Sequence, residues 1–319
     1  MECAPVGRSV NWTNAVFFAA TPIAAAAGTW LYARGHGIAA GDLVAFAAMM
    51  ALSSVGIIAG YHRYYAHRTY ECRPALQAFY LVAAASGFHQ SALVWASEHR
   101  DHHRFVDTAR DPYNIRKGFL WAHIGWILHG TTRAEFANVP DLVGDRLVRA
   151  QHRFWLPLAA LTGFGLPALI GLAFGRPLGG FLWGGLVRLV LFQHCTFLVN
   201  SAAHTSGTQP YTARESARDS WWLSLLTFGE GHHNFHHAFP GDYRIGFAWW
   251  HFDPAKWWIG LMGSLGLASR LHRTPQEHIA RARARESSNR DVATGHAARR
   301  DHHLPQLHVA GAERARGLQ

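Results

Sequence analysis

The sequence is poor in cysteine. Cys3, Cys72 and Cys195 are the three cysteines in 319 residues, they lie far apart, and no C-x-x-C motif occurs. An odd number of scattered cysteines argues against a disulfide framework and against a zinc ribbon. Nothing in the sequence matches a haem or iron–sulfur attachment motif. We therefore expect the functional side chains to face a reducing compartment, the cytosol.

Charge is absent from several long stretches. Residues 15–31, 43–60 and 154–174 form long apolar runs without a charged side chain, and residues 178–199 form a fourth run that only Arg188 interrupts. Each approaches the roughly 20 residues that a helix needs to cross a bilayer. A fifth run, 76–96, contains His89, Gln90 and Ser91. The chain is predicted to be an all-α integral membrane protein.

Basic residues predict the orientation of these helices. Arginines follow the second and fourth runs and crowd residues 100–153, whereas the turns at 34–42 and 175–177 carry one each. The positive-inside rule then places the two short turns outside and both termini in the cytoplasm. Histidines on both sides of the fifth run must reach the same site, so this run is expected to enter and return or to lie in the interface. The expected fold is four transmembrane helices in two hairpins beneath a cytoplasmic helical cap.

The formal net charge of +10 does not indicate nucleic-acid binding, because much of it lies beside the membrane runs and in the tail. We expect a membrane domain with its cap over residues 1–273. Residues 274–319 form a basic tail that is poor in large apolar side chains and is expected to be disordered. Its histidines His302, His303 and His308 are predicted not to bind metal. A basic cytoplasmic face favours anionic lipid head groups and an acidic electron-transfer partner.

Histidines gather in three clusters. Two clusters share the spacing H-x-x-H-H, which places three imidazoles within roughly a 100° arc of a helix and predicts that they converge on a metal centre. His232 points elsewhere, although a one-residue slip remains open. The third cluster holds a pair five residues apart, about 140° from eclipsed on an α-helix, so the chain must leave that geometry if both bind. The predicted ligands are His62, His67, His99, His102, His103, His233, His236 and His237.

The number of histidines narrows the choice of metal site. Imidazole suits zinc, copper, iron and nickel, so ligand type leaves the metal open. Eight ligands exceed the four of a structural zinc site and suffice for two ions with open positions. Soluble di-iron proteins use paired Glu-x-x-His motifs, and Glu230 to His233 is the only one here. Two redox metals at the ends of membrane helices favour oxygen chemistry on a lipid chain.

Long motifs run from about residue 56 to 271 in a fixed order. They are GYHRYYAHRTY, WASEHRDHHRF, DPYN, GFLWAHIGW, LVNSAAH, LTFGEGHHNFHHAFPGDYR and WWHFDPAKWWIGLMGSLGLA. In this order and spacing they resemble the membrane fatty acid desaturases, and within them the stearoyl-type acyl-CoA Δ9 branch. That resemblance implies four membrane helices with a cytoplasmic cap and a histidine-rich di-iron site, in agreement with the topology above.

The resemblance also implies roles for single residues. His204 becomes a ninth ligand, and Asn200 is expected to hold a metal-bound water. His89, Gln90 and Trp95 match positions near the bend of the acyl tunnel. The family sets chain length on the helix before the first cluster, where Ser54 and Met50 lie roughly 12 and 18 Å beyond His62.

Acidic residues near the clusters are expected to orient the imidazoles by accepting their second N–H. The candidates are Asp107, Asp111, Glu230 and Asp242.

The reaction that the resemblance implies uses two Fe²⁺ ions, O2 and an external electron donor to form a cis double bond in a fatty acyl chain, with release of water. No donor domain is apparent, so a separate ferredoxin or cytochrome b5 is expected. Two other interpretations remain: a lipid hydroxylase on the same scaffold, and a non-enzymatic membrane metal transporter or haem protein. Transporters place their ligands near the bilayer midplane, whereas these histidines lie at helix ends.

The sequence departs from the family at the head-group site. Acyl-CoA members have an Arg-Asp pair before the second cluster and an Arg-Lys pair after GW, and here Ser97-Glu98 and Gly130-Thr131 stand there. Arg116, Lys117 and Arg133 are the cations available as substitutes. Acyl-CoA and a glycerolipid both remain open as the acyl carrier.

Overall fold

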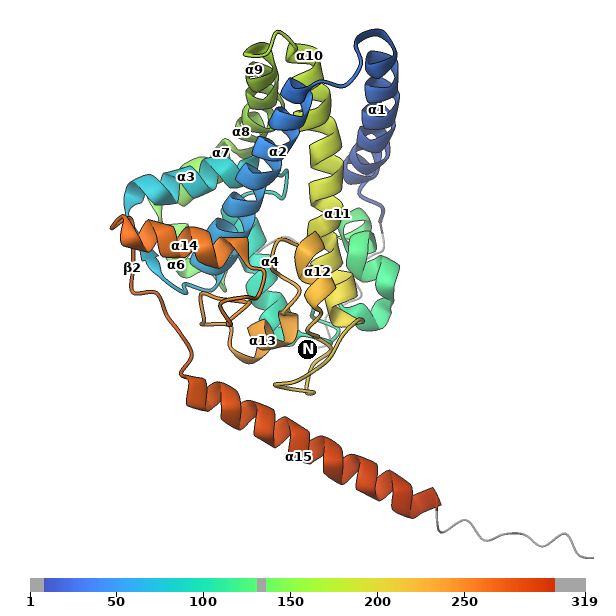
Figure 1. Cartoon of the computed structure of the whole chain (residues 1–319), viewed down its shortest axis with the longest axis vertical. Helices are drawn as coiled ribbons and strands as arrows, with labels where there is room; N and C mark the ends of the chain where they lie inside the picture. The colour runs from blue at the N-terminus through green and yellow to red at the C-terminus, as the bar shows by residue number, and fades with distance from the viewer. Residues whose placement is uncertain (1–8, 131–135, 302–319) are drawn as a thin grey trace, which may run out of the picture.

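A computed structural model describes residues 9–130 and 136–301, with side chains described as far as residue 292. The described chain is mostly helical. Its long helices run side by side towards one end of the molecule, and shorter helices gather at the other end (Figure 1).

Four helical stretches are long and apolar enough to span a membrane, which confirms the four spans predicted from the charge-free runs. The first is α1, Trp12–His36, and the second joins α2, Ala40–Ser54, to the π-helical segment η1, Val55–Ala66. The third comprises α8 (Trp155–Ala160), η4 (Leu161–Gly165) and α9 (Leu166–Leu172). The fourth comprises α10 (Pro177–Gly180), η5 (Phe181–Val187), α11 (Arg188–Ser201) and η6 (Ala202–His204).

The fifth apolar run forms no span of its own. It is divided between α3, Pro74–Ala85, and the start of α4, Ala92–Phe105. With 12 residues, α3 is too short to cross a bilayer. Pro74 begins α3 at a position where its missing N–H costs nothing, and Ser91 begins α4 by accepting the backbone N–H of Val94 at 3.4 Å.

The remaining elements are short. The helical ones are η2 (Ile115–Lys117), η3 (Trp121–Gly125), α5 (Trp126–His129), α6 (Pro140–Gly144), α7 (Arg146–Arg153), α12 (Trp221–Leu226), α13 (His233–Ala238) and α14 (Pro254–Ser264). Strands β1, Glu71–Cys72, and β2, Ala268–Ser269, form one antiparallel pair. In Figure 1, α4, α12 and α13 lie at the ends of α2 and α11 opposite the α1–α2 turn.

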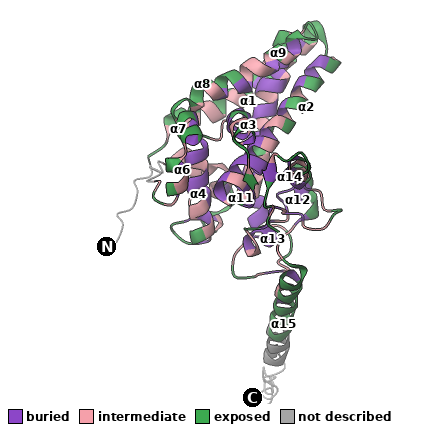
Figure 2. Ribbon diagram, turned by 90° about the vertical axis from the view of Figure 1, so that its left-hand side faces the viewer, coloured by how far each residue is buried: buried purple, intermediate pink, exposed green. Residues whose placement is uncertain are grey.

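The main apolar core lies where η1 packs against α3, α4 and α14. It includes Ile57, Tyr61, Tyr80 and Ile259, each at most 2% exposed. Gly56 allows the close approach of η1 and α3, because a Cβ at this position would lie 2.2 Å from the backbone nitrogen of Ala84. Buried residues continue along the inner faces of the long helices, while outward faces are exposed (Figure 2).

A helix occupies part of the basic tail, residues 274–319, for which disorder was predicted. Residues Gln276–Asp301 form α15, which projects away from the body in both views (Figures 1 and 2). Its Ala, Arg and Glu residues are strong helix formers, and Ile279 packs against Tyr211 and Phe235. His302, His303 and His308 lie outside the described residues.

Candidate metal centre

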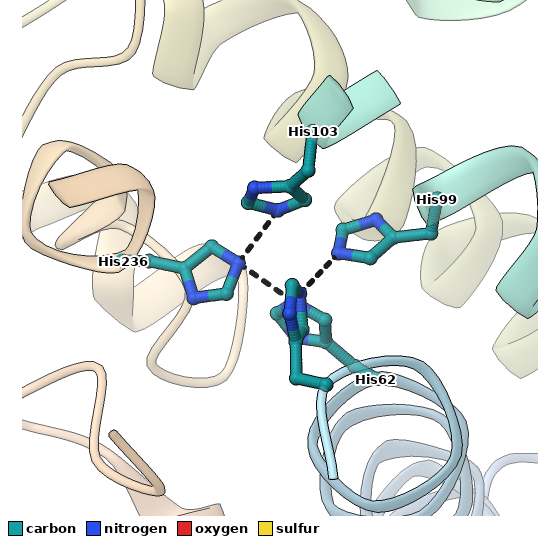
Figure 3. A group of neighbouring side chains, drawn as sticks. His62, His99, His103 and His236 are labelled. Carbon is teal, nitrogen blue, oxygen red and sulfur yellow. Dashed lines mark hydrogen bonds between the residues drawn. The ribbon is translucent and has the colours of Figure 1, made fainter. Parts of the chain in front are cut away.

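Nine buried or half-buried histidines form two groups. Within each group, the ligand nitrogens all lie within 4.8 Å of one another. The first group is His62, His67, His99, His103 and His236, and the second is His102, His204, His233 and His237. Figure 3 shows four imidazoles of the first group pointing towards one another from three separate segments. These are the nine histidines nominated from the sequence and the family resemblance.

Each H-x-x-H-H cluster is shared between the groups, so the expectation that all three of its imidazoles converge on one centre is wrong. On α4, His99 and His103 belong to the first group and His102 to the second. On α13 the order is reversed, because His233 and His237 belong to the second group and His236 to the first. Residues i and i+4 share one side of a helix, and the residue between them is rotated away from that pair. Two helices can therefore build two adjacent sites.

The pair His62 and His67 converges because η1 is π-helical. The backbone N–H of His67 donates to the carbonyl of His62 at 3.1 Å, a bond that spans five residues. Such bonds place residues five apart nearly above one another, as an α-helix does not. The chain thus leaves α-helical geometry at this pair, and both rings reach the same group.

The ring nitrogens at the centre of each group need a cation. The Nε2 atom of His236 lies 3.0 Å from Nε2 of His62 and 3.0 Å from Nε2 of His103. In the second group, Nε2 of His233 lies 3.1 Å from that of His204. Nε2 of His102 is buried and has no hydrogen-bond partner among the described residues. Converging nitrogen lone pairs of this kind fit a bound metal ion.

Carboxylates fix the outer nitrogens of three rings. Nδ1–H of His62 donates to Glu230 at 2.8 Å, and Nδ1–H of His102 donates to Asp111 at 2.9 Å. Nδ1–H of His237 donates to Glu215 at 2.7 Å. A proton on Nδ1 leaves Nε2 unprotonated and directed at the group centre, as metal binding requires.

Asp107 acts on the second group through a hydroxyl. The Oγ–H of Ser216 donates to Asp107 at 2.6 Å, so this oxygen accepts from Nδ1–H of His204 at 2.7 Å. Glu215 and Ser216 were not predicted. They lie in the loop after the fourth span, and no sequence spacing relates them to His204 or His237. Tyr113, whose hydroxyl lies 3.3 Å from Nδ1 of His99, was also missed, although it neighbours Asp111 in the DPYN motif.

Asp242 does not serve the histidines, which corrects its predicted role. Its carboxylate accepts from the Arg244 side chain at 2.8 and 2.9 Å and from the backbone N–H of Thr274 at 2.8 Å. Asp242 therefore joins the loop after α13 to the segment before α15. Its closeness in sequence to the third cluster did not predict its partners, because α13 ends before Asp242 and the chain then turns away from the histidines.

Burial favours the neutral form of six cluster imidazoles. It lowers the pKa of His99, His103 and His236 well below the usual value of 6.5, and neighbouring imidazoles lower the pKa of each further. The same causes lower the pKa of His67, His233 and His237. For Glu230, burial alone would raise the pKa, but His62 and Arg63 lower it, so the carboxylate stays charged. A neutral imidazole is the form that binds metal.

A cavity of about 650 Å³ adjoins both groups. His62, His99, His102 and His233 form part of its wall. The predicted residues Asn200, His89, Gln90 and Trp95 also line it, as do Glu98 and Gly130 from the divergent head-group positions. Trp95 stacks on His99 with ring centroids 4.8 Å apart. Apolar side chains cover much of the remaining wall, among them Phe17, Phe18, Ile57, Ile58, Phe88 and Phe192, and polar ones such as Asn14, Thr196 and Thr227 also line it.

Two tunnel predictions do not match this cavity. Met50 and Ser54 are not among its lining residues, and on the second span the lining residues are Ile57, Ile58 and His62. The hydroxyl of Ser54 instead donates to the carbonyl of Met50 at 2.7 Å. Both positions were taken from the family resemblance, and Met50 instead packs against the main apolar core.

Other predicted positions lie apart from the cavity. His232 belongs to neither group, and its ring stacks on His251 with centroids 4.2 Å apart. The Ser97 hydroxyl donates to Asn138 at 2.8 Å. Arg116 and Lys117 lie on the exposed segment η2 and do not line the cavity. Thr131 and Arg133 lie outside the described residues.

Known proteins share this sequence pattern. A family model described as fatty acid desaturase matches residues 41–262. A probable acyl-CoA desaturase of Schizosaccharomyces pombe is 40% identical over 275 residues, which is 85% of this chain and 57% of that protein. Acyl-CoA desaturase 1 of Saccharomyces cerevisiae is 38% identical, over 86% of this chain and 54% of that protein. Stearoyl-CoA desaturase 4 of Mus musculus is 33% identical, over 81% of this chain and 74% of that protein. The chain thus spans little more than half the length of the two yeast proteins.

Proposed function

Because the chain belongs to the fatty acid desaturase family, we propose that it is a membrane enzyme that introduces a cis double bond, at Δ9, into a long fatty acyl chain. One observation carries this proposal: two groups of converging imidazoles open onto a largely apolar cavity between helices that are long and apolar enough to span a membrane. An acyl chain is the ligand that such a cavity suits, and a redox metal pair is what nine imidazoles suit.

The proposed ligands are the nine histidines, divided between two iron ions. When bound, iron would supply the oxidation in which O2, two electrons and two protons remove two hydrogens from adjacent methylenes and leave two waters. Glu230, Asp111, Glu215 and the Asp107–Ser216 pair hold the protons on Nδ1 and keep Nε2 free. Asn200 lines the cavity, and we assign to it the role of holding a water when metal is bound.

The cavity residues exclude bulk water and hold the substrate. Trp95 lies against His99, so a chain in the cavity passes close to the first group. Phe88, His89 and Phe192 bound the same space, and burial together with Arg188 lowers the pKa of His89 to about 4. His89 is therefore a neutral wall residue. The apolar side chains of this wall favour an acyl chain over water beside the histidines, which would direct the oxidation to a C–H bond.

We place the histidine groups and both termini in the cytoplasm, where a soluble or membrane-bound electron donor can reach them. Exposed cations on the cluster side, such as Arg68, Arg104 and Arg273, favour an acidic carrier of the ferredoxin or cytochrome b5 type.

The test is lipid analysis of cells that express the chain with and without an active donor. A product 2 mass units lighter than its substrate supports desaturation, whereas a gain of 16 indicates the hydroxylase. Supplying the purified enzyme with acyl-CoA or with phospholipid then identifies the carrier.

The metal assignment is tested by variants. His204→Ala and His103→Ala should abolish product and each lower the iron content from two towards one per chain. His232→Ala, in the same motif but outside both groups, should retain most activity and iron. A visible spectrum with a Soret band, or iron that never exceeds one per chain, would contradict the di-iron proposal.

A further inference from the structure

A fully buried arginine lies inside the fourth span. The exposed fraction of Arg188 is 0%. Its Nε–H donates to the carbonyl of Gly184 at 2.9 Å, and its Nη atoms donate to the carbonyls of Ser86 and Gly163 at 2.7 and 2.9 Å and to the Ser53 hydroxyl at 3.3 Å. Every oxygen that accepts these hydrogen bonds is neutral, so no carboxylate offsets the free-energy cost of burying the guanidinium charge. Ionisable residues inside membrane segments are costly and usually functional.

The guanidinium joins four segments. Ser53 is on α2, Ser86 follows α3, Gly163 is in η4 and Gly184 is in η5. Two of these segments are π-helical, and π-bulges leave carbonyls free to accept from a side chain. The hydroxyls of Ser53 and Ser86 also lie 2.8 Å apart. Arg188 thus fixes α2, the turn after α3 and the third span relative to its own helix.

The turn that Arg188 holds forms part of the cavity wall. Two residues just after Ser86, Phe88 and Gln90, have φ of 55° and 65°, which non-glycine residues adopt only when their surroundings enforce it. Both residues line the cavity. Gly163, another acceptor of Arg188, has no room for a side chain, because a Cβ there would lie 2.7 Å from a ring carbon of Phe88. The arginine network therefore lies directly behind Phe88.

Along α11, this part of the wall lies away from the metal groups. Phe192, one turn beyond Arg188 on α11, lines the cavity and lies roughly 12 Å along the helix from Asn200. Arg188 lies roughly 18 Å from Asn200 by the same count. The side chain thus lies behind the end of the cavity that faces away from the histidines.

We propose that Arg188 is a positioning residue that fixes the closed end of this cavity and so sets the longest acyl chain that fits. The inference rests on the proposed function, since it takes the cavity ligand to be an acyl chain. The guanidinium fills the space behind Phe88 and Phe192 and holds the Ser86–Gln90 turn in its strained conformation. Its removal should deepen the cavity.

Binding can test this without turnover. We would measure the rise in melting temperature of the purified protein with saturated fatty acids of increasing length. For Arg188→Ala, the chain length that gives the largest rise should increase by at least two carbons. In expressing cells, the ratio of longer to shorter unsaturated product should increase by roughly tenfold, the discrimination typical of a methylene in an apolar pocket.

Two further variants provide controls. Arg176→Ala removes another multiply bonded arginine, one that holds Asp42 at the α9–α10 end of the bundle, and it should lower stability without changing chain preference. Ser53→Ala removes one partner of Arg188 at little steric cost and should shift the preference in the same direction by a smaller amount.

An unchanged preference in Arg188→Ala, with only reduced yield, would overturn the proposal. If Arg188→Ala does not accumulate, the same chain-length measurements are made on Ser53→Ala and Arg188→Lys, and an unchanged preference in both overturns the proposal. Failure of the proposed function is distinguishable: wild-type protein would then bind no fatty acid of any length and produce no unsaturated lipid with an active donor.

Discussion

At the scale of single residues, side chains outside the clusters determine how each imidazole is directed. Asp111 and Glu230 could be predicted because they lie next to a cluster in sequence and carry the right charge. Glu215 and Ser216 could not, since the loop that brings them to His237 and His204 has no periodic pattern. The prediction failed for Asp242 for the same reason, because sequence proximity does not determine where a loop carboxylate points.

Glu215 provides a test of this orienting role. Glu215→Ala removes the acceptor of the His237 Nδ1–H without removing a ligand, so iron affinity should fall about 10- to 100-fold. Titration of the metal-free protein with Fe²⁺ under anaerobic conditions measures it. Glu71→Ala, which removes an exposed carboxylate paired with Arg270, is the matched control and should bind iron as the wild type does. Equal affinity in the two variants would refute the role assigned to Glu215.

Asp219 should make stability depend on pH. Burial raises its pKa from 3.8 to about 7, while its carboxyl group accepts the backbone N–H of Phe235 at 3.0 Å. Between about pH 4 and 7 the folded protein therefore holds a proton that the unfolded chain releases, so stability falls as the pH rises through this window. Asp219→Asn keeps the acceptor and cannot ionise. The melting temperature of the wild type, relative to this variant, should decrease from pH 4.5 to pH 7, and a constant difference would contradict the raised pKa.

At the scale of elements, the apolar runs predicted the four spans, but not their local geometry. Counting at 3.6 residues per turn cannot reveal that residues 55–66 form a π-helix, because the apolar pattern of a fully buried helix is nearly continuous. That one difference brings the side chains of His62 and His67 to the same side of the helix. The shared spacing of the two H-x-x-H-H clusters predicted convergence, and only the positions of their imidazoles in the structure showed that each cluster divides between two groups.

The contact between η1 and α3 should be intolerant of added volume. A Cβ at Gly56 would lie 2.2 Å from the Ala84 nitrogen, which belongs to backbone and cannot rotate away. Gly56→Ala should therefore destabilise the protein by about 3 kcal/mol or more and impair iron binding through His62 and His67. Gly260→Ala on α14, where nothing lies within 4 Å, should be neutral or slightly stabilising. The melting temperatures of the two variants are measured in detergent. Similar values would mean that η1 can move away from α3 to accommodate the added methyl group.

At the scale of the whole molecule, the clusters lie at one end of four spans and the α1–α2 and α9–α10 turns at the other. Of the cations near those turns, Arg176 is neutralised by Asp42 at 2.8 Å. Arg34 is also exposed near the α1–α2 turn, but more of the exposed cations lie at the cluster end, among them Arg104, Arg110 and Lys117. The sequence was enough to predict this asymmetry, because orientation depends on charge counts rather than on contacts.

Orientation can be measured by labelling single cysteines. In a variant lacking the native cysteines, Ile38→Cys places a thiol in the exposed turn between α1 and α2, and Gln276→Cys places one at the exposed start of α15. The positive-inside rule predicts that a membrane-impermeant maleimide labels Ile38→Cys in intact cells and Gln276→Cys only in inverted vesicles. The reverse pattern would place the histidine groups outside, away from a cytoplasmic electron donor. Labelling of both thiols from one side would mean that the number of crossings between them is even, and the four-span arrangement would then be wrong.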